Sequence, residues 1–232
     1  MNNAARTRLK PARALLKLEQ RTTTGRIHTT MNGKIISEIV KIVVKPGFDL
    51  ASPGFAKLRQ TSVGGGAKEQ YYGLSHAEGP ARHLCWVIQW PETSGPLQAD
   101  SFRDALRQFD ANGSPRSWLV PFDDGSQPRR ALIAPCAQLC TVPLKRETNI
   151  AAISNYLHKT YSDCYEAPGF TGGYWGTALN DELMNWYYLG WETREAHDAY
   201  AETPLFWVEI NNLMPHMSGG SSDYYTFVQQ LD

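Results

Sequence analysis

Two histidines stand on either side of a polar turn in the first half of the chain, and they are the first candidates for chemistry. His76 closes one β-rich stretch and His83 opens the next. An imidazole titrates near neutral pH, so either side chain can accept or deliver a proton. The pattern predicts that His83 is catalytic, with His76 as a second candidate. A solvent-exposed histidine beside a loop would give the same pattern, and that alternative stays open.

Aromatic and polar residues in both halves are candidates for holding a substrate. Tyrosine and tryptophan offer flat apolar walls with one polar atom each, which suits an aromatic ligand. The substrate-binding candidates are Tyr71, Cys85, Gln89, Tyr174, Trp186 and Tyr188. The aromatic members could equally be ordinary core residues. A Cys85 nucleophile would need a neighbouring base, so we interpret this residue as an inert buried thiol.

Motifs for metals and cofactors are absent from the sequence. It contains no HExxH, no GxSxG and no dinucleotide fingerprint. None of its four cysteines belongs to a CxxC pair (Cys85, Cys136, Cys140 and Cys164). We therefore expect free thiols, no metal site and no cofactor.

An internal repeat indicates how the chain is organised. Tyr71-Tyr72-Gly73, a polar turn and a strand ending in Trp90 are matched by Tyr174-Trp175-Gly176, a turn and a strand ending in Trp191. This period of about a hundred residues equals one small domain, so we predict a tandem duplication. The expected parts are a first unit over 35–123, a linker over 124–130 and a second unit over 131–232.

Each unit reads as strand, helix, strand, strand, helix, strand. In the first unit, β-branched and alternating runs predict strands over 35–44, 71–76, 83–90 and 118–122, and apolar periodicity predicts helices over 53–62 and 100–110. In the second unit the expected strands are 132–142, 170–177, 183–191 and 224–228, with helices over about 147–161 and over 193–214, the latter broken at Pro204. This order is the ferredoxin-like βαββαβ split, an α+β fold.

The chain resembles the dimeric α+β barrel superfamily, most closely its antibiotic-biosynthesis-monooxygenase-like branch common in fungi. The resemblance rests on Gly169-Phe170-x3-Tyr174-Trp175-Gly176, followed by Leu189-Gly190-Trp191-Glu192-Thr193-x-Glu195-Ala196-His197. The first half carries a weaker copy. In that family two subunits close their sheets face to face, which implies that the two units of this chain form an intramolecular pseudo-dimer. A further homodimer stays open.

Strand alternation then predicts which side chains enter the lumen between the two sheets. If Trp90 and Trp191 face the helices, His83, Cys85 and Gln89 face the lumen, because successive strand residues point to opposite faces. The same alternation sends Trp186, Tyr188 and Gly190 into the lumen. Glu38 and Gln138 are further polar candidates whose facing stays open. Some relatives bind haem through a helical histidine, but the spacing from Trp191 differs here, so we interpret His197 as a packed residue.

The resemblance implies a cofactor-independent, monooxygenase-like enzyme of fungal secondary metabolism that acts on an aromatic or polyketide-type metabolite. His83 would remove a proton, aromatic walls would hold the resulting anion, and Gln89 would stabilise developing charge. One alternative is a cofactor-free cyclase, isomerase or decarboxylase that uses the same pocket. The other is a non-catalytic ligand-binding or stress-related barrel whose lumen is filled by core side chains.

Charge is distributed unevenly along the chain. Residues 1–34 carry eight Lys/Arg and one Glu, whereas the remainder has a net charge of −7. A mildly acidic body disfavours nucleic acid as a partner, and no apolar run is long enough to span a membrane. The basic N-terminal stretch is typical of an unstructured tail or of a mitochondrial transit peptide. We expect a cytoplasmic protein, with a mitochondrial location as the alternative.

Overall fold

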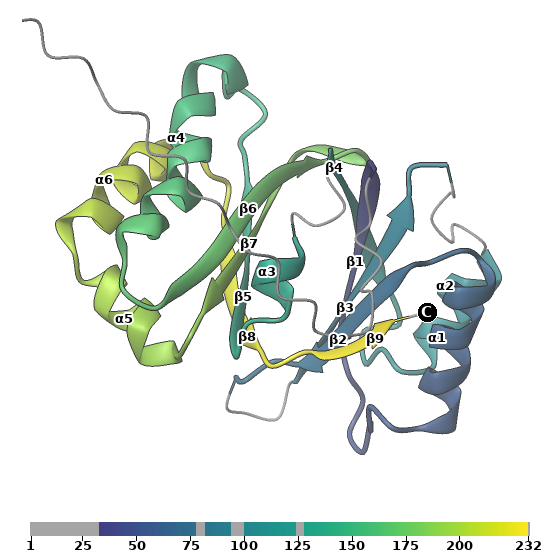
Figure 1. The fold of residues 1–232 in the computed structure, drawn as a ribbon. Helices are drawn as coiled ribbons and strands as arrows, with labels where there is room; N and C mark the ends of the chain where they lie inside the picture. Colours follow the sequence, from purple (N-terminus) through teal and green to yellow (C-terminus); the bar gives the residue numbers. More distant parts are fainter. Residues whose placement is uncertain (1–32, 78–81, 94–99, 124–127, 232) are drawn as a thin grey trace, which may run out of the picture.

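The computed structural model describes residues 33–77, 82–93, 100–123 and 128–231 (Figure 1). Most of the expected N-terminal tail, 1–34, and most of the expected linker, 124–130, lie outside the described residues. Among the described residues, no helix combines the length and the apolar composition needed to cross a bilayer.

The two units repeat the same element order around two antiparallel sheets. The first contains β1 (Ile35–Val43), α1 (Pro53–Gly64), β2 (Glu69–Leu74), β3 (His83–Pro91), α2 (Asp100–Arg107) and β4 (Arg116–Phe122). The second contains α3 (Arg129–Leu132), β5 (Cys136–Pro143), α4 (Ile150–Ser162), β6 (Phe170–Ala178), β7 (Asp181–Trp191), α5 (Arg194–Ala201), α6 (Pro204–Leu213), β8 (Ser221–Tyr225) and β9 (Val228–Leu231), with short 3-10 turns at Asp163–Glu166 and Met214–His216. The strand orders β4-β1-β3-β2 and β8-β5-β7-β6 are equivalent, so the predicted α+β fold with two ferredoxin-like units is confirmed.

Helices cover the outer face of each sheet, and the inner faces meet (Figure 1). Trp90 is fully buried in the cluster between the first sheet and its helices, which also contains Phe55 and Phe102. Trp191 is fully buried in the same way among Leu157 and Tyr200. Side chains at the alternate positions of the strands fill a third cluster that draws on both sheets. The sheets therefore pack face to face as an intramolecular α+β barrel, as the alternation around the two tryptophans predicts.

The short helix α3 lies between the two sheets (Figure 1). The expected strand over 132–142 begins only at Cys136, because residues 129–132 form this helical turn. Its Ala131 and Leu132 are buried in the cluster between the sheets. Gly190 of β7 makes room for the helix, since a Cβ there would lie 3.0 Å from the Cα of Ala131. Side chains of α3 thus occupy space that the sequence analysis assigned to an enclosed pocket.

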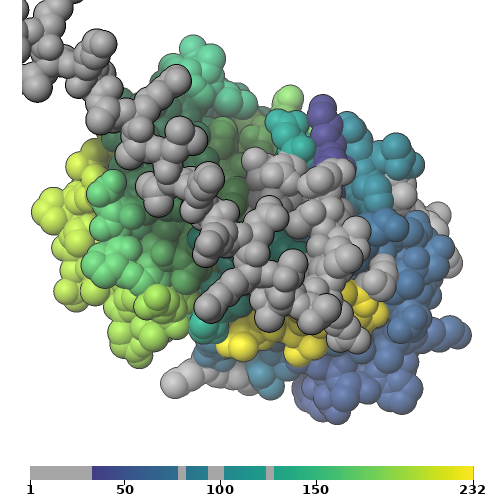
Figure 2. All heavy atoms as spheres, viewed as in Figure 1, coloured from purple at the N-terminus to yellow at the C-terminus, as the bar shows by residue number. Residues whose placement is uncertain are grey.

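Two seams close the barrel. At one seam the amide of Leu179, after β6, donates to the carbonyl of Leu119 in β4 at 2.7 Å. At the other, the expected last strand over 224–228 is in fact two strands, β8 in the second sheet and β9 beside β2 in the first. Gly73 permits this crossing, because a Cβ there would lie 2.9 Å from the Thr226 carbonyl oxygen. The C-terminal segment accordingly lies against the first half (yellow against blue, Figure 2).

Candidate functional site

A cavity of about 560 Å³ lies on the helix side of the second sheet, beneath α4, α5 and α6. Most of its walls are apolar or aromatic: Val142, Leu189, Trp191, Tyr200, Phe206, Ile210, Met214 and Met217. A few polar side chains converge on one part of the wall: Gln138, His197, Ser222 and Tyr224. An apolar cavity with a small number of convergent polar groups is the usual form of a small-molecule site.

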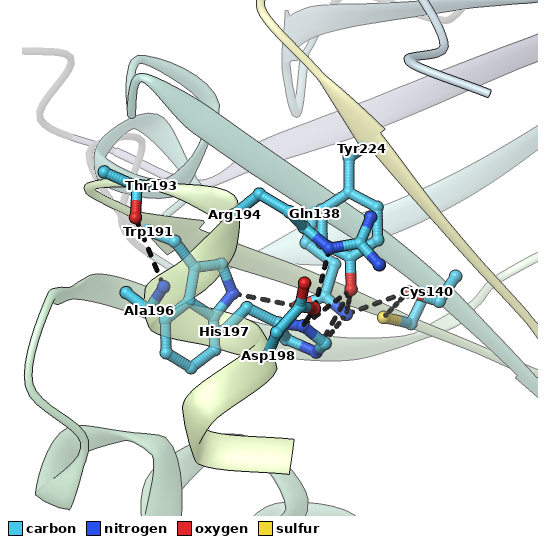
Figure 3. Close-up of polar contacts among 10 residues, drawn as sticks. Gln138, Cys140, Trp191, Thr193, Arg194, Ala196, His197, Asp198 and Tyr224 are labelled. Atoms are coloured by element: carbon cyan, nitrogen blue, oxygen red, sulfur yellow. Dashed lines mark hydrogen bonds and ion pairs between the residues drawn. The ribbon is translucent and has the colours of Figure 1, made fainter. Parts of the chain in front are cut away.

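Local sequence places each polar group of this wall. Gln138 in β5 pairs directly with Tyr224 in β8, and both side chains point to the helix side of the sheet. Helix α5 begins just after β7, where Thr193 caps it by accepting a hydrogen bond from the amide of Ala196 at 3.2 Å. This cap fixes the start of the helix, so that its first turn presents His197 to Gln138 and Tyr224 (Figure 3).

Trp191 orients the Gln138 amide (Figure 3). The indole Nε1–H of Trp191 donates to Oε1 of Gln138 at 2.9 Å, which leaves the amide nitrogen directed at the cavity wall. That nitrogen lies 2.8 Å from Ser222 Oγ, 3.1 Å from Tyr224 Oη and 3.2 Å from His197 Nε2. It has two hydrogens and therefore serves two of these three acceptors at a time.

One arrangement of protons satisfies the whole cluster. His197 Nδ1 lies 2.9 Å from Asp198 Oδ1 and donates to it, which leaves Nε2 as an acceptor. The Tyr224 hydroxyl lies 2.9 Å from Nδ1 and 3.1 Å from Nε2 of His197. With the Nδ1 proton directed to Asp198, this hydroxyl donates to Nε2 and accepts from Gln138. Arg194 completes the cluster, because its Nε donates to Asp198 at 2.8 Å and its guanidinium lies 3.7 Å from the centre of the Tyr224 ring. The result is a continuous chain from the Gln138 amide through Tyr224 and His197 to Asp198, which we call the Tyr–His relay.

Burial sets the protonation states of the Tyr–His relay. Desolvation lowers the pKa of His197 below its usual value, so the imidazole is neutral near pH 7. Desolvation raises the pKa of Tyr224 to about 12, so the phenol keeps its proton. The hydrogen bond from Arg194 lowers the pKa of Asp198, which therefore stays ionised. A neutral imidazole behind a protonated phenol can receive a proton through that phenol.

The structure places the predicted histidines away from this cavity. His83 lies at the end of the lumen, where its Nδ1 is 3.8 Å from Asp223 Oδ1, and Asp223 also pairs with Lys41. His76 is exposed, and its Nε2 lies 3.1 Å from Thr226 Oγ1. Asp223 and Tyr224 are neighbours in β8 and point to opposite faces, so His83 and the Tyr–His relay lie on opposite sides of the second sheet. The catalytic role of the two histidines stays a prediction.

The predicted substrate-binding residues do gather in the lumen. Tyr71, Cys85, Trp186 and Tyr188 are buried in the cluster between the sheets, and Tyr174 packs against it. Burial raises the pKa of the Cys85 thiol to about 12, consistent with an inert thiol.

Polar atoms of the lumen are only partly paired. The Gln89 amide nitrogen donates to Ser37 Oγ at 3.1 Å. Gln89 Oε1 and Trp186 Nε1 are buried without a hydrogen-bond partner among the described residues. Side chains from both sheets and from α3 pack together around these atoms. A substrate-binding role for these residues stays a prediction.

For two members of the Tyr–His relay, Gln138 and His197, the sequence contains a signal of their position that the predictions above do not include. Gln138 is a long polar side chain in a mainly apolar strand. The alternation that places Trp191 extends to it through the pairing of β5 with β7. His197 belongs to the motif that carries the family resemblance, but we interpreted it as a packed residue. For Tyr224 the sequence predicts a strand but not the side of the sheet that its side chain faces. Its contact with Gln138 depends on the register between β5 and β8, for which one sequence holds no signal.

Solved structures with the same fold span nearly the whole chain. A protein of Fusobacterium nucleatum provisionally called a monooxygenase superposes with a TM-score of 0.58 at 10% identity, over 86% of this chain and 95% of its own. A protein of Lactobacillus acidophilus, also provisionally called a monooxygenase, gives 0.54 at 13% identity over 85% and 96%. An anthrone oxidase-like protein gives 0.54 at 12% identity over 86% and 94%. No protein-family model matches the chain, and a comparison with curated proteins gives no match.

These likenesses define a class of fold. At such identities they show a shared duplicated α+β barrel, in which both units lie in one chain. Within that class, the cavity under α5 and α6 and its Tyr–His relay are features of this chain's own residues.

Proposed function

We propose that the chain is a cofactor-independent, monooxygenase-like enzyme that binds a flat aromatic or polyketide-type metabolite in the cavity beneath α5 and α6. The observation that carries the proposal is the Tyr–His relay, which opens on an apolar cavity large enough for a small multi-ring molecule. The names of the three structural neighbours agree with this reaction class. We further propose that the enzyme acts in fungal secondary metabolism, and this part of the proposal rests on the family resemblance alone.

The relay can begin the reaction by removing an acidic proton from the substrate. Tyr224 passes its own proton to Nε2 of His197 and takes the proton of the substrate in exchange. Asp198 accepts from Nδ1 and stabilises the imidazolium that forms. Because the cavity walls are apolar, the imidazolium and the substrate anion attract each other more strongly than they would in water.

Gln138 and the aromatic walls can stabilise the anion. The Gln138 amide nitrogen lies within hydrogen-bond distance of Tyr224, so an oxyanion that reaches Tyr224 can also accept from Gln138. An electron-rich carbanion formed in this way can react with molecular oxygen. For an anthrone, the methylene becomes a carbonyl, one oxygen atom is retained and the other leaves as water with the two methylene hydrogens.

Oxygen uptake tests the proposal directly. Purified protein is mixed with anthrone and with 1,8-dihydroxyanthrone, and product oxygen is traced with ¹⁸O₂. We expect one labelled oxygen per product, and a loss of about 100-fold or more in His197→Asn and Tyr224→Phe. His158→Asn is the matched control, because His158 is exposed on α4 and should keep full activity.

Other outcomes separate the alternatives. Turnover without oxygen uptake, still sensitive to His197→Asn, would indicate a cyclase, isomerase or decarboxylase. Activity that survives His197→Asn but is lost in His83→Ala would place the chemistry in the lumen. Binding without turnover of either compound would favour a ligand-binding barrel and would overturn the enzyme proposal for this substrate class.

A further inference from the structure

The first half repeats the hydrogen bond that orients Gln138. Trp90 Nε1 donates to Oε2 of Glu38 at 2.9 Å, the same distance as from Trp191 to Gln138. The two acceptors occupy equivalent places, because Glu38 pairs across the first sheet with Ile88 and Leu119 as Gln138 pairs across the second with Leu189 and Tyr224. The two halves therefore share the tryptophan donor and differ in its acceptor, which is a carboxyl group in the first half and an amide in the second.

A second cavity lies over Glu38, on the helix side of the first sheet. Its volume is about 610 Å³, and α2 and the edge strand β4 form its walls. Val40, Phe102, Leu106 and Leu119 supply apolar surface. The turn between β6 and β7 closes one side, where the Asn180 amide donates to the Ser117 carbonyl at 3.0 Å and accepts from the Leu119 amide at 3.1 Å.

Charge distinguishes this cavity from the first one. Arg103, Arg107 and Arg116 line it, with Asp181 as the acidic residue among its exposed lining groups. Arg107 also pairs with Asp104, one helical turn earlier. Glu38 is the buried acidic group of this cavity, at 3% exposure. Leu119 stands where the second half has Tyr224, so the Tyr–His relay is not repeated here.

We propose that the first half holds a second small-molecule site, for an organic acid with an apolar body, whose anionic group lies among the three arginines and whose hydrogen-bond donor meets Glu38. Guanidinium groups are suited to carboxylate or sulfonate oxygens, which they bind in a planar, bidentate fashion. The apolar walls provide the remaining contact area. Glu38 accepts from Trp90 and from the hydroxyl of Ser117, and the two oxygens of its carboxyl group have further capacity to accept from a ligand. This site is separate from the proposed enzymatic one.

A fluorescent organic acid provides the test. 8-Anilinonaphthalene-1-sulfonate combines a sulfonate, an apolar ring system and an N–H donor, and its binding is measured by titration calorimetry on the full chain. The proposal predicts a site that weakens at least tenfold in the double variant Arg107→Glu, Arg116→Glu. Both side chains are exposed, so this variant should fold. Lys57→Glu, an exposed change on α1 outside the cavity lining, is the matched control and should leave binding unchanged.

A steric variant checks the location. Leu106→Trp fills the cavity and should remove the same site, with near-ultraviolet circular dichroism to establish that the fold is retained. Ile210→Trp fills the other cavity and should leave this site intact. Equal binding by wild type and the double arginine variant would overturn the proposal. Oxygen uptake is measured separately. Absence of the sulfonate site would leave the enzymatic proposal untouched, and absence of oxygen uptake would leave the proposal of a second binding site untouched.

Discussion

The phenolic hydroxyl of Tyr188 donates a hydrogen bond of 3.0 Å to Oγ of Ser37 and so joins the second sheet to the first across the lumen. Both residues are fully buried. Gln89 donates to the same Ser37 oxygen from within the first sheet. The lumen at this point is therefore a packed and hydrogen-bonded interface between the two units.

Removing this link should affect stability rather than catalysis. In Tyr188→Phe the hydroxyl is lost while Ser37 keeps its bond from Gln89, so we expect a cost of about 1 kcal/mol in the free energy of unfolding. Urea denaturation measures this cost, and oxygen uptake should stay at the wild-type rate. A variant that is stable but inactive would instead place Tyr188 in the substrate site.

Gly190 controls the fit between α3 and β7. A Cβ at this position would lie 2.4 Å from Thr171 Oγ1 and 3.0 Å from Ala134 Cβ, which forces a shift of the packed backbone. We expect Gly190→Ala to destabilise the fold by about 1–3 kcal/mol, the usual cost of overpacking. Gly219→Ala is the matched control, since its nearest neighbour would be 4.0 Å away. Equal unfolding midpoints for the two variants would show that α3 is not tightly packed on the sheet.

The sequence was sufficient for the fold and for the facing of the strands, because both depend on local periodicity. Trp90 and Trp191 face the helices as expected, and the period of two then assigns Cys85 and Trp186 correctly to the lumen. These inferences need only the identity of neighbouring residues along one strand.

The location of the cavity beneath α4, α5 and α6 could not be predicted from the same information. Whether a space between layers stays open depends on distant segments, and here α3 enters the lumen from a stretch expected to hold the end of the linker and the start of a strand. The Tyr–His relay joins Gln138, His197 and Tyr224 from three separate elements, so it depends on sheet register and on how α5 packs. Neither can be read from one sequence.

His197 should give the enzyme an acidic limb in its pH–rate profile. Burial lowers the pKa of His197 below 6.5, and only the neutral imidazole can accept a proton. Activity should therefore be constant at pH values well above this lowered pKa and should fall as the pH drops through it. The hydrogen bond to Asp198 raises the pKa of His197 and so opposes the effect of burial. Asp198→Ala should shift the acidic limb to still lower pH, in addition to lowering the rate, and a shift to higher pH would contradict the assignment.

Glu38 should make the stability of the wild-type chain decrease as pH rises. Burial raises its pKa in the folded state to about 7 from the ordinary value of 4.5. The folded state then holds this proton more tightly than the unfolded state, so the contribution of Glu38 to stability is greatest below pH 4.5 and declines until the pH passes 7. The shift corresponds to a contribution of at most about 3 kcal/mol. Glu38→Gln keeps an acceptor for Trp90 and removes the titrating group, so it should be more stable than the wild type at pH 8.

The second half offers the reciprocal change. Gln138→Glu places a carboxyl group opposite Trp191 in an equally buried setting, and it should give the chain an additional loss of stability between pH 5 and pH 8. Urea midpoints across this pH range compare the two variants with the wild type. The tryptophan donor is the same in both halves. If the urea midpoint falls less steeply with pH in Glu38→Gln and more steeply in Gln138→Glu than in the wild type, the effect belongs to the carboxyl group itself. Parallel pH profiles for Glu38→Gln and the wild type would show that Glu38 is ionised in the folded protein at neutral pH and would contradict the raised pKa.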